Sequence, residues 1–183
     1  MGMKMQRLWL AGMGLALAMA PATVQAQGVG KAACVMDQLS ADHRADLARE
    51  MMGSSDDGSR GSQADELRSV IKACVAKLGI PNDQAPAYAQ FVVANILLEW
   101  TRGNFATYNI PTGPIDAAVG FQANISSFDA EAGVTDEQGE AIIAAYDAVG
   151  IDVRKFDDPK LELIGYYVGA LGHYWKLAPQ FGS

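Results

Sequence analysis

The chain has 183 residues, half of them hydrophobic, with 14 basic and 21 acidic residues and a formal net charge of −7. This acidic surface repels phosphate backbones and anionic lipid, which argues against nucleic-acid binding and against electrostatic docking on a membrane. The length suits a single domain with a substantial hydrophobic core.

Residues 1–26 have the three parts of a secretory signal peptide. Lys4 and Arg7 precede an apolar stretch over residues 8–20, which is shorter than the about 20 residues that span a bilayer. We expect cleavage after Ala26, because a proline would block the earlier candidate cut. The mature chain then keeps 157 residues and a net charge of −9, and we expect it in the periplasm or outside the cell, without a membrane span.

The chain contains two cysteines, Cys34 and Cys74. Cys34 follows two small residues, but Lys31 stands where a lipid-attachment motif needs an apolar residue, which argues against a lipoprotein. Exported proteins generally oxidise such a pair, so we predict one disulfide. Closing a loop of roughly 40 residues contributes about 4 kcal/mol in the chain-entropy model. A metal site with two thiolates is the alternative, and no histidine or third cysteine stands at ligand spacing to support it.

Helical periodicity with start and stop signals continues through most of the mature chain. In the first half, the expected helices cover residues 31–39, 41–52, 63–78 and 83–102. Ser40 and Ser62 are the expected N-caps of the second and third helices. The polar, glycine-rich stretch 53–62 between these two helices predicts a flexible connector.

Three more helices are expected in the second half, over residues 114–128, 136–149 and 158–177. Pro114 suits the first position of its helix, and Thr135 is an N-cap followed by acidic residues. No alternating strand pattern, internal repeat or domain boundary is evident. The sequence therefore predicts a single all-α domain over residues 27–183, a bundle of about six to seven helices with one disulfide.

The apolar stretch 161–177 contains Glu162 and His173, both costly in lipid, so we expect a buried helix. Three glycines share one face of this helix: Gly165, Gly169 and Gly172. Because glycine costs a helix up to about 1 kcal/mol relative to alanine, their clustering predicts the close approach of another backbone. The sixth expected helix has a matching alanine-rich face: Ala141, Ala144, Ala145 and Ala148.

The fourth and seventh expected helices are apolar on most sides, and each carries one narrow polar stripe. If the two stripes face each other, they form a polar pocket inside the bundle, where helical bundles place their ligand and metal sites. The candidate pocket residues are Asn95, Glu99, Glu162, Tyr166 and His173. The alternative is that each stripe contacts water, with Glu99 paired to Arg102 along its own helix.

Templates for catalytic and cofactor sites are poorly matched. The chain has only two histidines, and His43 is expected on a solvated, charged face, so neither the usual zinc nor the usual di-metal ligand pattern is present. The acidic stretch 129–140 has Val134 where a calcium loop requires glycine. The glycine-rich nucleophile and phosphate motifs are also missing. We therefore expect no cofactor and no metal.

These observations favour a non-enzymatic, exported helical protein of the bacterial cell envelope that binds a partner protein or assists an envelope process. The alternative is a small-ligand carrier with the polar pocket between the fourth and seventh helices. A weaker alternative is an acid–base enzyme that uses the same pocket, with Glu99 and Glu162 as its carboxylate pair.

Overall fold

The computed structural model describes residues 29–53, 60–119 and 134–183. These residues form seven α-helices and no strand, which confirms the predicted all-α bundle. The elements are η1 (Gly30–Ala32), α1 (Ala33–Met36), α2 (Ala41–Met51), α3 (Arg60–Leu78), α4 (Ala85–Thr107), α5 (Gly113–Val119), α7 (Asp136–Ala148), η3 (Val153–Lys155) and α8 (Asp158–Phe181). Four predicted features lie wholly or partly outside the described residues: the signal peptide, the connector 53–62, the end of the helix 114–128 and the start of the stretch 129–140.

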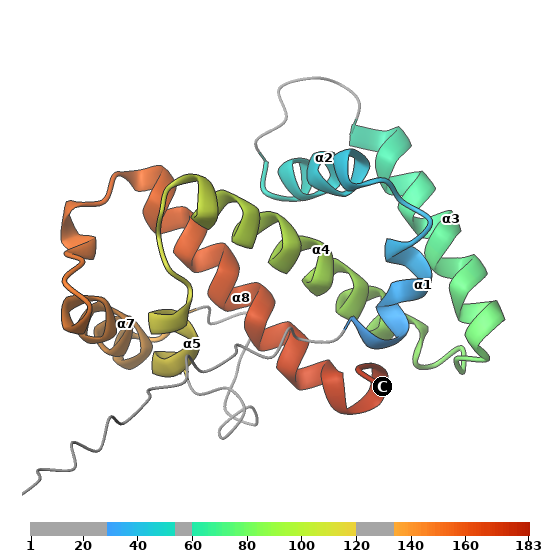
Figure 1. Ribbon diagram of the computed structural model, residues 1–183. Coiled ribbons are helices and arrows are strands. Elements are labelled where there is room, and N and C mark those ends of the chain that lie inside the picture. The colour runs from blue at the N-terminus through green and yellow to red at the C-terminus, as the bar shows by residue number, and fades with distance from the viewer. Residues whose placement is uncertain (1–28, 54–59, 120–133) are drawn as a thin grey trace, which may run out of the picture.

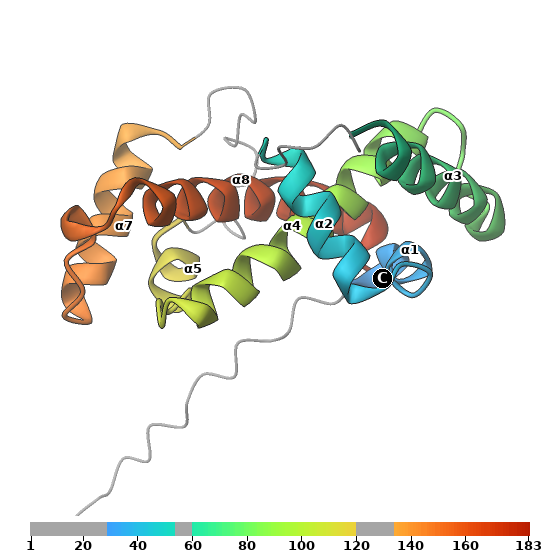
Figure 2. The same cartoon turned by 90° about the horizontal axis from the view of Figure 1, so that it is seen from above.

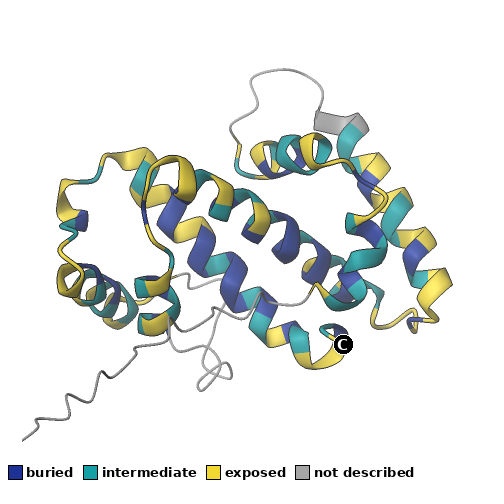
Figure 3. Cartoon of the chain, viewed as in Figure 1, coloured by how far each residue is buried: buried dark blue, intermediate teal, exposed yellow. Residues whose placement is uncertain are grey.

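The two longest helices, α4 and α8, lie side by side at the centre of the molecule (Figures 1 and 2). Helices α1, α2 and α3 gather at one end of this pair, and α5 and α7 pack against each other at the other end. The buried faces of α4 and α8 contain most of the core (Figure 3). Helix α8 therefore packs on α4, and not on the alanine-rich sixth helix as the sequence suggested.

Polar side chains set the start of several helices as the sequence predicted. Ser40 and Thr135 cap α2 and α7 by accepting a hydrogen bond from a backbone N–H in the first turn. Asp157, which was not predicted as a cap, does the same for α8. The third helix differs from its prediction. It begins at Arg60, so Ser62 lies inside the helix and is not its N-cap.

Two helices continue past their predicted ends because aromatic residues beyond those ends belong to the core. Helix α4 extends beyond Arg102, and Phe105 in the added turn is almost fully buried. Helix α8 extends through Pro179, and the equally buried Phe181 follows. Their rings contact three aromatic side chains of the core, Tyr88, Phe91 and Tyr167. Burying such a ring contributes about 1.5–3 kcal/mol, enough to outweigh weak local helix signals.

The predicted disulfide is present. Cys34 on α1 and Cys74 on α3 are joined at an S–S distance of 2.10 Å, with 5.9 Å between their Cα atoms. The side-chain amide of Gln38 lies against this bond, 3.1 Å from the sulfur of Cys74. The bond ties the short first helix to the long third helix at one end of the molecule.

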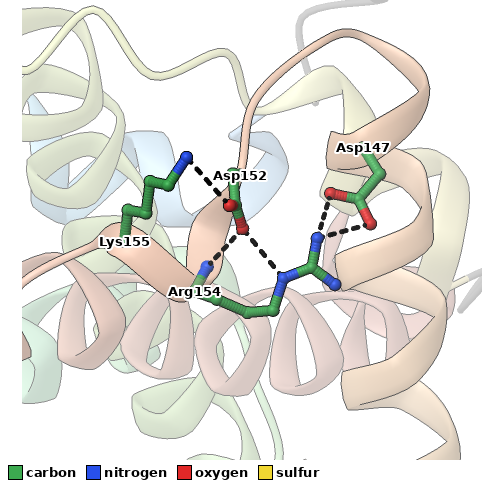
Figure 4. A network of polar contacts seen from close by, with 4 residues as sticks. All are labelled: Asp147, Asp152, Arg154 and Lys155. Carbon is green, nitrogen blue, oxygen red and sulfur yellow. Dashed lines mark hydrogen bonds and ion pairs between the residues drawn. The ribbon is translucent and has the colours of Figure 1, made fainter.

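An exposed network of ion pairs joins the end of α7 to η3, a short turn that the sequence pattern did not predict (Figure 4). The guanidinium of Arg154 donates to both carboxylate oxygens of Asp147, at 2.8 and 2.9 Å, and to Asp152 at 2.8 Å. Lys155 adds a contact to Asp152 at 3.3 Å. Solvent screens such exposed pairs, so they contribute little to stability.

None of the helices in the described part of the chain combines the length and the apolar character that crossing a membrane requires.

Candidate functional site

An open groove of about 400 Å³ lies between the two central helices; we call it the α4–α8 groove. The residues that α4 contributes to it are Ala89, Gln90, Val93, Ala94 and Leu97. The residues that α8 contributes are Gly165, Tyr166, Gly169, Ala170 and His173. Apart from an amide, a phenol and an imidazole, this lining is aliphatic or glycine.

Helical spacing explains why these side chains share one surface. Ala89, Val93 and Leu97 follow each other at intervals of four along α4, and Gly165 and Gly169 do so along α8. A Cβ atom added at either glycine would meet no atom within 4 Å. The close backbone approach predicted for these two glycines is therefore absent from the described structure. Their missing side chains keep the groove open.

Tyr166 forms part of the exposed rim of the groove, and Met51 lines a neighbouring hollow that shares Ala89 and Val93 with the groove. The phenol of Tyr166 donates to the backbone carbonyl of Met52 at the end of α2, over a long distance of 3.4 Å. Tyr166 remains 37% exposed and Met51 40% exposed. The rim therefore presents apolar surface together with one hydroxyl.

His173 lies half-buried on the α8 side of the groove. Burial, and to a smaller extent the positive charge of Lys176, lowers the pKa of the His173 imidazole below its ordinary value of 6.5. The ring is therefore mainly neutral at pH 7. A neutral imidazole can both donate and accept a hydrogen bond, so it adds a polar group to the groove without adding a charge.

The other three candidate pocket residues lie elsewhere. Asn95 is buried and donates its side-chain amide to the Phe91 carbonyl, 2.8 Å away on its own helix. Glu162 is exposed on α8 and does not line the groove. Glu99 lines a separate hollow between α2 and α4. The structure thus brings Tyr166 and His173 together in one groove and leaves Asn95, Glu99 and Glu162 out of it.

Glu99 pairs with Arg44 of α2, whereas the sequence suggested Arg102 of its own helix as the partner. Two hydrogen bonds of 2.7 Å join the Arg44 guanidinium to the Glu99 carboxylate. Arg44 also donates to the backbone carbonyls of Met36, at 2.8 Å, and of Leu39. The hydrogen bond to Glu99 raises the pKa of Arg44, and burial opposes this with a smaller effect.

Arg44 therefore joins α1, α2 and α4 in one contact, and its side chain is only 16% exposed. Sequence reasoning missed this residue because it stands in a charged segment that looks entirely solvated. Its partner Glu99 is 55 positions further along the chain, and no local pattern links the two.

A second polar cluster, also missed, lies where α5 meets α8. The phenol of Tyr167 donates to a carboxylate oxygen of Asp116 at 2.8 Å, and the guanidinium of Arg102 lies 5.8 Å from the centre of the Tyr167 ring. Burial raises the pKa of the Asp116 carboxyl, and the Tyr167 hydrogen bond and the Arg102 charge oppose this with smaller effects. Nearby, Tyr146 of α7 donates to the Pro111 carbonyl at 2.8 Å. In the sequence, Asp116 resembles ordinary helix decoration.

His43 is less solvated than expected. Its side chain is 21% exposed, and Nε2 lies 3.6 Å from a carboxylate oxygen of Glu66. The reason is that α3 packs across α2 and covers part of the charged face that carries His43. Within residues 29–53, 60–119 and 134–183, no three histidine, cysteine or acidic side chains gather closely enough to hold a metal ion.

The apolar surface continues beyond the groove. A second hollow of about 440 Å³ lies between α2, α3 and α4, and it shares Ala89 and Val93 with the α4–α8 groove. Its other apolar side chains include Leu47, Leu67 and Ile71. The exposed side of α4 is thus bordered on both flanks by apolar depressions.

Fold and site together define an all-α, single-disulfide protein with an open apolar groove between its two central helices. Comparison of the chain with models of protein families, with curated proteins and with solved structures found no match. Function is therefore inferred from the chemistry of the groove, because a fold alone does not specify it.

Proposed function

We propose that this chain is an exported, non-catalytic binding module that receives an apolar helix of a partner protein in the α4–α8 groove. The observation that carries the proposal is the open groove between the two central helices. A Cβ atom added at Gly165 or Gly169 would meet no atom within 4 Å there. A slot of this kind lets another backbone approach closely, and grooves between helices commonly receive the apolar face of an amphipathic helix.

The rim of the groove supports recognition of a protein. Tyr166 is large and exposed and lines the groove with the half-buried Val93 and Leu97, and the exposed Met51 lines the adjoining hollow together with Val93. Contiguous exposed apolar surface of this kind marks interaction sites on soluble proteins. Tyrosine in particular provides apolar contact area together with a hydrogen-bonding group at protein interfaces.

Two further features support an exported protein that binds and does not catalyse. The disulfide between Cys34 and Cys74 suits an oxidising compartment such as the periplasm, in agreement with the signal peptide predicted over residues 1–26. The described lining of the groove contains no carboxylate or basic side chain other than the His173 imidazole, whose pKa is lowered by burial, and Glu99 and Glu162, the carboxylates considered for acid–base chemistry, lie outside it.

The test uses Nile red, an uncharged dye that fluoresces in apolar surroundings, as a probe of the groove. Gly169→Leu places a side chain in the open slot, and Gly139→Leu on α7 is the matched control because a Cβ there also meets no atom within 4 Å. We expect the wild type and the control to bind the dye, and the Gly169 variant to bind it on the order of tenfold more weakly, corresponding to about 1.4 kcal/mol. Equal binding by all three would reject the groove as a binding site.

A second measurement tests for a helical ligand. A synthetic amphipathic peptide with a leucine stripe and balanced glutamate and lysine residues is added to the dye complex. We expect it to displace Nile red from the wild type. Dye binding without displacement would reject the helix as occupant.

The small-ligand carrier remains a second candidate because of one observation. A volume of about 400 Å³ lies within the range of small-molecule sites, and Tyr166 and His173 supply polar groups that could orient a ligand. Native mass spectrometry separates the two candidates. A co-purified molecule of constant mass, lost in the Gly169→Leu variant, would favour the carrier; an unliganded mass would count against it.

A further inference from the structure

The exposed face of α8 carries charges of opposite sign at its two ends. Asp158 and Glu162 lie in the first turns of the helix, and Lys176 lies near its end. At 3.6 residues per turn, these three residues lie within about 60° of the direction of Gly165 and Gly169. All three are exposed, and none of them forms an ion pair with another residue in the described part of the chain. The face of α8 that carries Gly165 and Gly169 therefore has an acidic end and a basic end.

The spacing of these charges is symmetric about one glycine. Glu162 stands seven residues before Gly169, and Lys176 stands seven residues after it. Seven residues are close to two helical turns, so both side chains return to the face that carries Gly169. If a second α8 crosses the first in the antiparallel direction at this glycine, each Glu162 lies opposite the Lys176 of the other helix.

We infer that the helix received by the groove is α8 of a second copy of this chain, packed antiparallel about Gly169. The inference rests on the proposed function and names its partner. Two-fold symmetry makes both Glu162–Lys176 contacts equivalent, so each charge is used twice in the assembly. The complex is a homodimer in which the two copies contribute the same surface.

The apolar side chains of this face fit the same arrangement. Leu161 is 45% exposed and Tyr166 is 37% exposed, and they flank the glycines on opposite sides. The glycines permit the helix axes to come close at the crossing point, and the flanking side chains then pack against the other copy. This arrangement covers large exposed apolar side chains that are otherwise in water.

The overall charge of the chain makes local complementarity necessary. With a net charge of −7, two copies repel each other over most orientations. Opposite charges placed across an interface select one orientation and disfavour the others. An antiparallel α8 pair places Glu162 against Lys176, whereas a parallel pair places Glu162 against Glu162.

A charge exchange tests both the partner and the orientation. Sedimentation velocity of the purified exported chain over a wide concentration range should show a monomer–dimer equilibrium. Glu162→Lys and Lys176→Glu should each weaken dimerisation on the order of tenfold, because each replaces two attractive contacts by two repulsive ones. An equimolar mixture of the two variants should recover wild-type association, because every contact in the mixed dimer again joins opposite charges.

Two controls keep the test specific. Glu140→Lys changes the charge equally on the exposed surface of α7 and should leave dimerisation unchanged. The double variant Glu162→Lys with Lys176→Glu should associate with itself like the wild type. Circular dichroism confirms that each variant is folded before it is compared.

The outcomes separate this inference from the proposed function. A wild type that stays monomeric, or single variants that associate as well as the wild type, would overturn the second copy as partner. If Nile red still binds in a manner that depends on Gly169, the groove remains a binding site for a different helix. If Gly169→Leu changes neither dye binding nor association, both proposals fail.

Discussion

The two ends of the α4–α8 pair are fastened by different chemistry. At the α1–α3 end, a disulfide joins α1 to α3, and four hydrogen bonds of Arg44 tie α2 to α1 and α4. At the α5–α7 end, the hydroxyl of Tyr146 donates to the Pro111 carbonyl, and the hydroxyl of Tyr167 donates to the titratable Asp116, beside the exposed ion pairs of Arg154. One end is therefore sensitive to reduction and the other to pH, although both flank the same core.

Removing the disulfide should have the largest effect. Replacing Cys34 and Cys74 by alanine releases a loop with a sequence separation of 40, which should lower the free energy of unfolding by about 4 kcal/mol. Urea denaturation of the variant, and of the wild type with and without reductant, measures the loss. Hydrogen exchange should increase more in α1 and α3 than in α7. An equal increase of hydrogen exchange in α7 would show that the disulfide stabilises both ends of the molecule alike.

Breaking the Arg44 contact should have the next largest effect at the same end. Arg44→Met removes four hydrogen bonds, two of them to a carboxylate, and leaves two backbone carbonyls without this donor. We expect a loss of about 2 kcal/mol in the free energy of unfolding. Arg49→Met is the control. Within the described residues Arg49 pairs with Asp46 alone, on the exposed surface, so its replacement should cost less than about 0.5 kcal/mol. Similar losses in both would show that Arg44 does not join the helices.

The pH dependence of stability should arise at the opposite end, with the smallest effect. The pKa of Asp116 is raised in the folded protein above its ordinary value of 3.8, so the folded state binds this proton more tightly than the unfolded state. The resulting stabilisation is complete below pH 3.8 and is lost as the pH rises through the folded pKa. Asp116→Asn should remove this contribution to the pH dependence.

The hydroxyl of Tyr167 affects the pH at which this stabilisation is lost. Tyr167→Phe removes the hydrogen bond that lowers the pKa of Asp116, so the loss of stability should move to higher pH. Denaturation curves of the wild type and both variants, recorded from about pH 3 to about pH 7, would measure the shift in the pH at which stability is lost. An unchanged pH profile in both variants would assign the dependence to other groups.

Local signals predicted those parts of the fold that local chemistry determines. Ser40 and Thr135 cap their helices because the bonds they accept come from the next few residues. Local signals predict ends for α4 and α8 that are several residues too early. Both helices continue because Phe105 and Phe181 pack against aromatic rings that are distant in sequence. Burial against a partner far away in sequence has no local signature.

In the groove too, local spacing predicted some features, and others depended on residues distant in sequence. Helical spacing correctly grouped Gly165 and Gly169 on one face, but it could not show whether a neighbour covers that face or leaves it open. The ion-pair partner of Glu99 could not be predicted for a similar reason, because Arg44 comes from another helix. A pattern identifies residues that share a face, and only the tertiary arrangement determines what that face meets.

The order in which the helices leave the ribosome affects when the core can close. Helix α4 ends at Thr107, about 50 residues before α8 begins at Asp158, and the gap must be synthesised before the native pair forms. Until then Phe91 has no Tyr174 to stack on. A nascent chain therefore exposes the apolar face of α4 to its surroundings until α8 has been synthesised.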